Sequence, residues 1–201
     1  MGRLRAAILV IALMWAAPAA ADPLDRWFAY VAEASARFGI PEPWIRRVMR
    51  AESGGRTIMN GRPIVSRAGA MGLMQLMPGT WREMRALLGL GHDPHQPRDN
   101  ILAGTAYLRA MYDRFGYPGL FAAYNAGPAR YSRHLATGRR LPAETVAYVA
   151  SIAGAGTAPV SPAQRPAPTL FALQAAPAPV AAAGDDKPQD GLFVRLNSSP
   201  R

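Results

Sequence analysis

Apolar residues recur at helical spacing along most of the first 150 residues, and glycine or proline interrupts them at intervals. This pattern predicts helices over residues 24–38, 43–52, 78–88, 99–115, 118–124 and 142–152. Long runs of alternating apolar and polar residues, which would indicate strands, are absent. We therefore expect a mostly α-helical domain with a small irregular or β portion between Thr57 and Leu76.

The predicted helix over 43–52 places a carboxylate among apolar side chains. One face of this helix carries Trp44, Ile45, Val48, Met49 and Glu52. Gly54 and Gly55 end the helix, so the carboxylate lies in its last turn, where the helix dipole is negative. Burial and dipole both disfavour the charged form, so we expect a raised pKa for Glu52. A carboxylic acid that stays protonated near neutral pH can serve as a general acid.

An alternative leaves Glu52 without a chemical role. Its side chain would then extend from the helix end into water, as many terminal glutamates do. The helix taken alone leaves both interpretations open, because a perturbed carboxyl is found at structural sites as well as functional ones.

The two ends of the chain differ from its middle. Residues 1–21 predict a secretory signal peptide: Arg3 and Arg5 precede an apolar run, and small residues precede an expected cleavage site before Asp22. A retained membrane anchor is the alternative, but the apolar run is shorter than the roughly 20 residues that span a bilayer. The domain then covers residues 22–153, and the protein is expected to be exported to the periplasm.

Residues 154–201 are rich in alanine and proline, which predicts an extended and mostly disordered tail. Alternating apolar residues return near the end, over 190–196. This terminal segment is predicted either to dock on a partner as an added strand or to be an unstructured chain end.

Composition adds a basic charge and excludes thiol chemistry. The 201 residues include 23 Lys and Arg against 13 Asp and Glu, with no cysteine. Lys187 is the single lysine, so arginine supplies nearly all of the positive charge. An anionic wall polymer, an anionic membrane or nucleic acid would suit such a chain. However, the arginines are scattered along the sequence and no basic cluster is interleaved with aromatics, so we expect no nucleic-acid partner, and a solvated surface is the simplest interpretation of the charge.

Five segments carry polar or glycine residues that simple core packing does not require. Each segment taken singly has an ordinary structural explanation, such as a turn glycine or a helix cap. They are Glu52–Ser53, Gly69–Thr80, Asn100–Leu108, Ala123–Pro128 and Glu144–Val149. In this order and spacing they resemble the soluble lytic transglycosylase family, lysozyme-like enzymes that cleave peptidoglycan. The resemblance covers about residues 25–152 and implies a lysozyme-like helical fold.

The resemblance also implies a reaction and a role for Glu52. Family members cleave the bond between N-acetylmuramic acid and N-acetylglucosamine without water. One glutamate protonates the glycosidic oxygen and then takes the proton from the muramic acid C6 hydroxyl, which closes a 1,6-anhydro ring. Matched onto this chain, the catalytic residue is Glu52. No Asp or Glu lies between Glu52 and Glu83, which fits a single catalytic carboxylate, although Glu144 or another distant acid could approach in space.

The same matching implies substrate-binding residues. Ser53 and Gln75 are expected to hydrogen-bond the sugar or to orient groups around the acid, and Met74 to form an apolar floor. Tyr124 is expected to contact the Glu52 carboxylate. The list is completed by two further positions, Asn125 to hold the groove or the substrate and Glu144 to bind the stem peptide or support the wall.

One stretch departs from the family pattern, and other functions stay open. Family members have an aromatic residue, Asn or Asp, and Pro soon after the Glu-Ser pair, whereas residues 54–63 here form a longer loop. A hydrolytic lysozyme with a second carboxylate and an inactive peptidoglycan-binding scaffold are the alternative functions. His92 and His95 lie in a loop with no third ligand in view, so we expect no metal and no cofactor.

The expected partners are peptidoglycan glycan strands and, through the tail, proteins of an envelope-spanning secretion or conjugation apparatus. The small, exported, one-domain members of the family that accompany such machinery motivate the second expectation. We expect a monomer.

Overall fold

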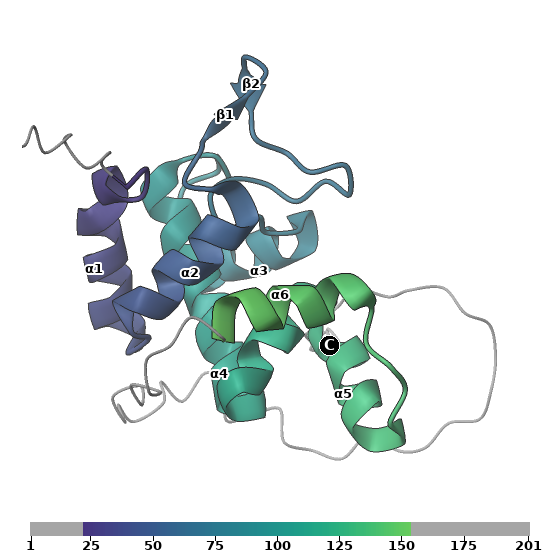
Figure 1. The fold of residues 1–201 in the computed structure, drawn as a ribbon. Helices are drawn as coiled ribbons and strands as arrows, with labels where there is room; N and C mark the ends of the chain where they lie inside the picture. The colour runs from purple at the N-terminus through teal and green to yellow at the C-terminus, as the bar shows by residue number, and fades with distance from the viewer. Residues whose placement is uncertain (1–21, 154–201) are drawn as a thin grey trace, which may run out of the picture.

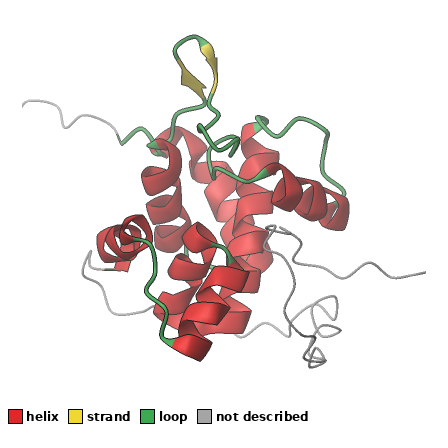
Figure 2. Cartoon of the chain, turned by 90° about the vertical axis from the view of Figure 1, so that its right-hand side faces the viewer, coloured by secondary structure: helices red, strands yellow, loops and turns green. Residues whose placement is uncertain are grey.

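Helices form nearly all of the computed structural model, which describes residues 22–153. The elements are η1 (Asp25–Trp27), α1 (Phe28–Phe38), α2 (Glu42–Ser53), β1 (Ile58–Met59), β2 (Arg62–Pro63), α3 (Pro78–Leu88), α4 (Pro97–Ala126), α5 (Pro128–Thr137) and α6 (Ala143–Ala153). Figures 1 and 2 show a helical body from which the β1–β2 hairpin protrudes. The predicted mostly α fold is confirmed. The predicted signal peptide and tail lie outside the described residues.

Helix α4 is the centre of the fold. It packs against α1, α3, α5 and α6 (Figure 1), and every residue from Asn100 to Leu108 is buried. The close packing depends on Gly104, because a Cβ atom there would lie 2.5 Å from the Cβ of Met74. Two helical stretches were predicted here with a stop at Gly116, and the chain does leave helical geometry at Gly116 and Tyr117 before continuing to Ala126.

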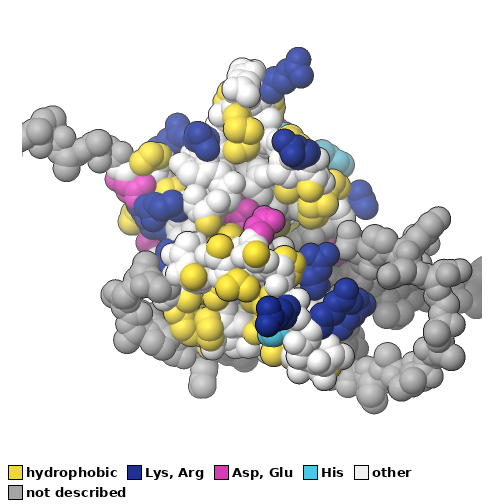
Figure 3. Space-filling view, turned by 45° about the vertical axis from the view of Figure 1, so that its right-hand side comes forward, with side chains coloured by type: hydrophobic (Ala, Val, Ile, Leu, Met, Phe, Trp, Pro, Cys, Tyr) yellow, Lys and Arg dark blue, Asp and Glu magenta, His cyan; other side chains and the backbone are white. Residues whose placement is uncertain are grey.

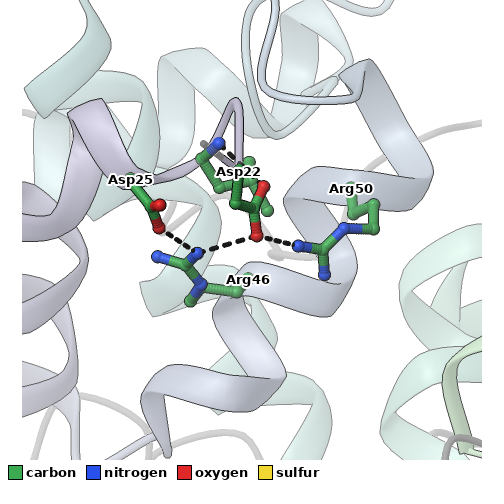
Figure 4. Close-up of polar contacts among 5 residues, drawn as sticks. Asp22, Asp25, Arg46 and Arg50 are labelled. Atoms are coloured by element: carbon green, nitrogen blue, oxygen red, sulfur yellow. Dashed lines mark hydrogen bonds and ion pairs between the residues drawn. The ribbon is translucent and has the colours of Figure 1, made fainter. Parts of the chain in front are cut away.

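Helix α2 is held by burial on one side and by ion pairs on the other. Its apolar face is buried, and Trp44 meets an aromatic cluster of α4, with its ring centroid 5.1 Å from that of Tyr117. On its outer side Arg46 lies 2.9 Å from a carboxylate oxygen of Asp22, which also pairs with Arg50 (Figure 4). The backbone N–H of Leu24 and the two arginines lower the pKa of Asp22. These contacts fasten the start of the domain to α2.

The region predicted to be irregular or β is built around a short hairpin. Ile58 pairs with Pro63 and Met59 with Arg62, and Asn60 and Gly61 both adopt positive φ angles of 52° and 74°. Two consecutive positive φ angles are the geometry of a type I′ hairpin turn, for which Asn-Gly is a preferred sequence. The longer loop that departs from the family pattern is therefore an exposed hairpin.

Helix α5 was not predicted. None of its residues is fully buried, and Tyr131, which is half-buried, packs against the core. So few apolar positions do not give a clear periodic pattern. Among residues 22–153, no helix is both long enough and apolar enough to cross a lipid bilayer.

Candidate active site

Glu52 lies where the sequence placed it, in the last turn of α2. The helix ends at Ser53, and Gly54 adopts a left-handed conformation with φ of 61° while its N–H bonds the carbonyl of Arg50. The residues before Glu52 on the same face, Val48 and Met49, are fully buried. The helix therefore carries the carboxyl group from the core to the point where the chain turns away.

The environment of Glu52 raises its pKa from 4.5 to about 7. Burial is the largest cause, because it disfavours the charged carboxylate. A hydrogen bond from Tyr148 acts in the opposite direction, and the negative charge of Glu144 raises the pKa further. At neutral pH a large fraction of Glu52 is therefore protonated, as a proton donor requires.

The hydrogen bond to Glu52 comes from α6. The hydroxyl of Tyr148 donates to Oε1 of Glu52 at 2.7 Å, across 96 positions in the sequence. Burial raises the pKa of the Tyr148 phenol well above its usual value, so the hydroxyl stays protonated. Contacts between α2 and α6 hold the two side chains in place.

Tyr124 bonds a different acceptor from the one expected. Its hydroxyl donates to the carbonyl of Met74 at 2.7 Å, so Tyr148 and not Tyr124 donates the hydrogen bond to Glu52. Tyr124 is nevertheless close enough to Glu52 that the carboxylate helps to raise its phenol pKa, after burial. The buried position of Tyr124 on α4, facing the loop at Met74, explains the difference.

We predict that Tyr148→Phe raises the pKa of Glu52 above about 7, because the hydrogen bond that favours the carboxylate form is lost. A carbon-detected NMR titration of the Glu52 carboxyl group measures this directly. Tyr131→Phe, in which another half-buried phenol is changed, is the control and should leave the titration unchanged. An unaltered or lower pKa in Tyr148→Phe would show that Tyr148 does not stabilise the charged form.

The loop over residues 71–76 lies beside the end of α2 and is fixed by one asparagine. Oδ1 of Asn100 accepts a hydrogen bond from the N–H of Met74 at 2.7 Å, and its Nδ2 donates to the carbonyls of Pro94 at 2.8 Å and Met71 at 3.1 Å. Gly72 has a φ of +76°, and a Cβ atom there would lie 2.4 Å from Nδ2 of Asn100. This glycine therefore leaves the space that the Asn100 side chain fills.

Ser53 joins the loop to α2. Its hydroxyl lies 2.9 Å from the carbonyl of Leu73 and 3.2 Å from that of Met49, and it accepts a hydrogen bond from the N–H of Gly55. With 2% of its surface exposed, Ser53 is not placed to reach a sugar. Two roles were expected for Ser53, binding the sugar or orienting the groups around Glu52. Its contacts agree with the second role.

Two residues of this loop were expected to meet the substrate, and only Gln75 is accessible, whereas Met74 is buried. Met74 is fully buried and packs against Gly104, so the expectation that its side chain lines an apolar floor is wrong, and it supports the loop from below. Gln75 is half-buried with a positive φ of 47°, and its Nε2 donates to the carbonyl of Gly72 at 2.8 Å. Its amide oxygen is left for another partner.

The other two expected residues lie on α4 and α6. Asn125 is half-buried at the end of α4, and Glu144 is exposed in the first turn of α6. Figure 3 shows acidic side chains at the middle of one face, between α6 and the part of the molecule that carries the hairpin. The effect of Glu144 on the pKa of Glu52 shows that the first turn of α6 lies near the acid.

Two residues matter more to this arrangement than the sequence analysis assigned. Tyr148 and Asn100 both stand in the matched segments, yet neither was given a role at the site. The signal for Asn100 was an amide at the start of an otherwise apolar helix, because a buried amide needs partners. Tyr148 lies four residues after Glu144, on the same helical face.

Comparison with known proteins identifies the family to which this chain belongs. The family profile described as the transglycosylase SLT domain matches residues 29–146, which is more than half of the chain. The chain belongs to the SLT-domain transglycosylase family. The match includes Glu52, Asn100 and Glu144, while Tyr148 follows it by two residues.

Relatives of this chain match it over only part of their own length. The soluble lytic murein transglycosylase of Escherichia coli K12 is 38% identical over 122 residues, which cover 56% of this chain and 18% of that protein. A transglycosylase of Enterobacteria phage PRD1 is 35% identical over 91 residues, covering 45% of this chain and 31% of that protein. The chain thus spans less than a third of the length of either relative.

A solved structure shares the SLT-domain fold. The lytic transglycosylase Slt of Pseudomonas aeruginosa, an inactive variant with glutamate changed to glutamine, superposes with a TM-score of 0.55 at 30% identity. The superposition covers 65% of this chain and 23% of that one.

Proposed function

We propose that this protein is a lytic transglycosylase that cleaves peptidoglycan between N-acetylmuramic acid and N-acetylglucosamine and leaves 1,6-anhydro ends. The proposal rests on a single half-buried carboxyl group, Glu52. Because its pKa is about 7, Glu52 can give up a proton and take one back near neutral pH. Membership of the SLT-domain family and the names of its relatives give the substrate class.

The proposed reaction needs Glu52 twice. Protonated Glu52 gives its proton to the glycosidic oxygen as the bond from C1 of N-acetylmuramic acid breaks. The resulting carboxylate then accepts the proton of the C6 hydroxyl, whose oxygen bonds to C1 and closes the ring. The proton balance is zero and no water is consumed. A pKa near the working pH favours both transfers. The hydrogen bond from Tyr148 holds one carboxyl oxygen, and in this proposal the other exchanges the proton with the substrate.

The other residues bind or position in this proposal. Buried contacts hold the loop against the end of α2 and against α4. They are made by Ser53, Met74 and Tyr124. Gln75 and Asn125 are half-buried polar side chains that can face the saccharide.

A hydrolytic lysozyme is the second candidate, and the position of Glu144 favours it. Glycosidases that use water position a second carboxylate near the acid, and the charge of Glu144 does reach Glu52. Glu144 is also exposed on the first turn of α6, where a water molecule can reach it.

The variant Glu144→Gln separates the two candidates. In a transglycosylase it should retain cleavage within about threefold, because loss of a neighbouring negative charge alters only the Glu52 pKa. That pKa should fall, since the like charge raises it, and the alkaline limb of kcat/KM should move to lower pH. In a hydrolase that uses Glu144 as base, cleavage should fall by about 10² or more. Dye release from labelled peptidoglycan across pH measures both.

An envelope location and a role beside a secretion or conjugation apparatus form the finer part of the proposal. The protein would open local gaps in the wall for an assembling apparatus, held there by the tail over 154–201. Deletion of residues 184–201 should leave cleavage of purified peptidoglycan intact and impair assembly of the apparatus. Normal assembly after the deletion would refute this part and leave the enzymatic proposal in place.

A further inference from the structure

Four arginines gather around one hollow near the start of α6. The hollow has a volume of about 390 Å³ and is lined by Arg130, Arg133, His134, Arg139, Arg140, Leu141 and Pro142. The expectation that the arginines are scattered is wrong for these four, which lie within residues 130–140 on α5 and the segment after it. Figure 3 shows Lys and Arg side chains with a histidine in this part of the molecule.

The cluster has no counter-charge of its own. In residues 22–153, the guanidinium groups of these four arginines form neither an ion pair nor a hydrogen bond with another residue. The stretch from Pro128 to Pro142 contains no acidic residue. By contrast Arg46, Arg98 and Arg109 are all paired with carboxylates. Positive charges brought together without partners repel one another, and an anionic ligand would relieve that repulsion.

The backbone around the hollow is held in place. Nδ1 of His134 lies 2.7 Å from the carbonyl of Arg139, so the ring nitrogen donates a hydrogen bond there. The N–H of Arg139 in turn donates to Oγ1 of Thr137 at 3.3 Å, and that hydroxyl donates to the carbonyl of Arg133. None of these contacts uses a guanidinium group, so the arginine side chains stay available to a ligand.

The hollow borders the site at Glu52. Leu141 and Pro142, which line it, directly precede α6, and α6 carries Glu144 and the tyrosine that bonds Glu52. At 1.5 Å per residue, six helical residues from Pro142 to Tyr148 correspond to about 9 Å. A polymer lying across Glu52 could therefore place a side branch in the hollow.

The chemistry favours carboxylates of a discrete ligand over a membrane surface. A guanidinium group forms paired hydrogen bonds with a carboxylate, and a concave site encloses a small group rather than a flat layer. A helix that binds a membrane presents several apolar side chains beside its basic ones, whereas Leu135 is the one large apolar side chain strongly exposed on α5. The peptide branches of peptidoglycan carry free carboxylates.

We propose that Arg130, Arg133, Arg139 and Arg140 bind the free carboxylates of the peptide branches of peptidoglycan while the glycan strand lies across Glu52. This inference rests on the proposed function. It makes the protein selective for glycan strands that carry peptides, through contacts that take no part in bond cleavage.

The test measures binding in the Glu52→Gln background, so that the ligand is not consumed. The full chain from residue 22 is titrated with soluble glycan fragments, with or without prior amidase removal of the peptides. The variant Arg133→Gln/Arg140→Gln removes two charges of the cluster. The variant Arg37→Gln/Arg82→Gln removes two exposed charges from α1 and α3 and is the matched control. Circular dichroism confirms that each variant is folded.

We expect Arg133→Gln/Arg140→Gln to weaken binding of peptide-bearing fragments by about tenfold, the effect of losing two solvent-exposed ion pairs. Binding of peptide-free fragments should not change, and the control should match the parent on both. Equal affinities of the two double variants for peptide-bearing fragments would overturn the inference. The same variants are also titrated with vesicles containing phosphatidylglycerol. If Arg133→Gln/Arg140→Gln weakened binding only to these vesicles, the cluster would be assigned to lipid and the inference would be overturned.

Failure of this inference and failure of the proposed function are distinguishable. If the Glu52→Gln parent binds neither kind of fragment and the protein with Glu52 intact cleaves no peptidoglycan, the substrate class itself is wrong and the inference falls with it. If the parent binds and the protein cleaves, only the role of the arginines is at issue, and the variants decide it.

Discussion

Glu52→Gln abolishes cleavage of peptidoglycan, with an expected fall in kcat of about 10³-fold or more. Glutamine preserves the size of the side chain, and its amide oxygen can still accept the hydrogen bond from Tyr148. It cannot deliver a proton to the glycosidic oxygen. Binding of glycan strands should persist, because the loss concerns the transition state rather than the ground state. Dye release gives the rate, and sedimentation with insoluble peptidoglycan gives the binding.

The related structure from P. aeruginosa is an inactive glutamate-to-glutamine variant, which supports this expectation. Glu83→Gln is a suitable control, because Glu83 is another partly buried glutamate, whose pKa burial also raises. Retention of more than a tenth of the activity in Glu52→Gln, with Glu83→Gln at the parental rate, would assign the proton donor to another residue.

The same substitution should alter stability with a defined pH dependence. The pKa of Glu52 is raised from 4.5 to about 7 in the folded protein, so between these values the unfolded chain loses this proton while the folded chain keeps it. Stability therefore falls as the pH rises through this window, by up to about 3 kcal/mol. Glu52→Gln removes this penalty. Its gain in the free energy of unfolding should be larger at pH 8 than at pH 4, and a gain independent of pH would contradict the raised pKa.

Asn100→Ala destabilises the domain by about 3–5 kcal/mol. The substitution leaves one buried N–H, that of Met74, and two carbonyls, those of Met71 and Pro94, without their partner, and each such loss costs about 1–3 kcal/mol. The freed loop also carries Gln75 and the carbonyl that anchors Tyr124, so activity should fall even at temperatures where the variant stays folded. Urea denaturation of parent and variant measures the difference.

Asn60→Gly provides the matched control for that experiment. Asn60 lies exposed in the hairpin turn with a positive φ that glycine adopts readily, so its replacement should change the free energy of unfolding by less than about 1 kcal/mol. Equal effects of the two asparagine substitutions would show that the contacts of Asn100 do not hold the loop.

The sequence was sufficient for what depends on local pattern. The apolar face of α2 and the glycines after it fixed the position of Glu52 in the last turn, and Gly116 marked the break in α4. Helix α5 was not predicted because its residues are at most half-buried, which leaves few apolar positions to show a periodicity. What depends on packing between distant segments could not be deduced from periodicity. The choice between Tyr124 and Tyr148 as donor to Glu52 is set by how α4 and α6 cross α2, and both tyrosines stand in equally suggestive motifs.

Family resemblance named the residues at the site more reliably than their contacts. Ser53 and Met74 were expected near the substrate, yet both are buried. Ser53 bonds the carbonyl of Leu73 and so helps to hold the loop beside Glu52. Asn100 packs directly against Gly72, although the two residues stand 28 positions apart in the sequence. A sequence motif does not show such a contact. The arginine cluster is different, because its four members stand within residues 130–140 and the sequence already groups them; what the sequence does not show is the hollow that they line.

Product analysis in isotopically labelled water tests the central claim most directly. Purified peptidoglycan is digested in H₂¹⁸O with the chain from residue 22 and, in parallel, with Glu52→Gln, and the soluble fragments are weighed by mass spectrometry. We expect 1,6-anhydro-muramic acid ends without ¹⁸O, present with the parent protein and absent with the variant. Reducing ends that carry ¹⁸O would show that water is the nucleophile and that the protein is a hydrolase, in contradiction to the account.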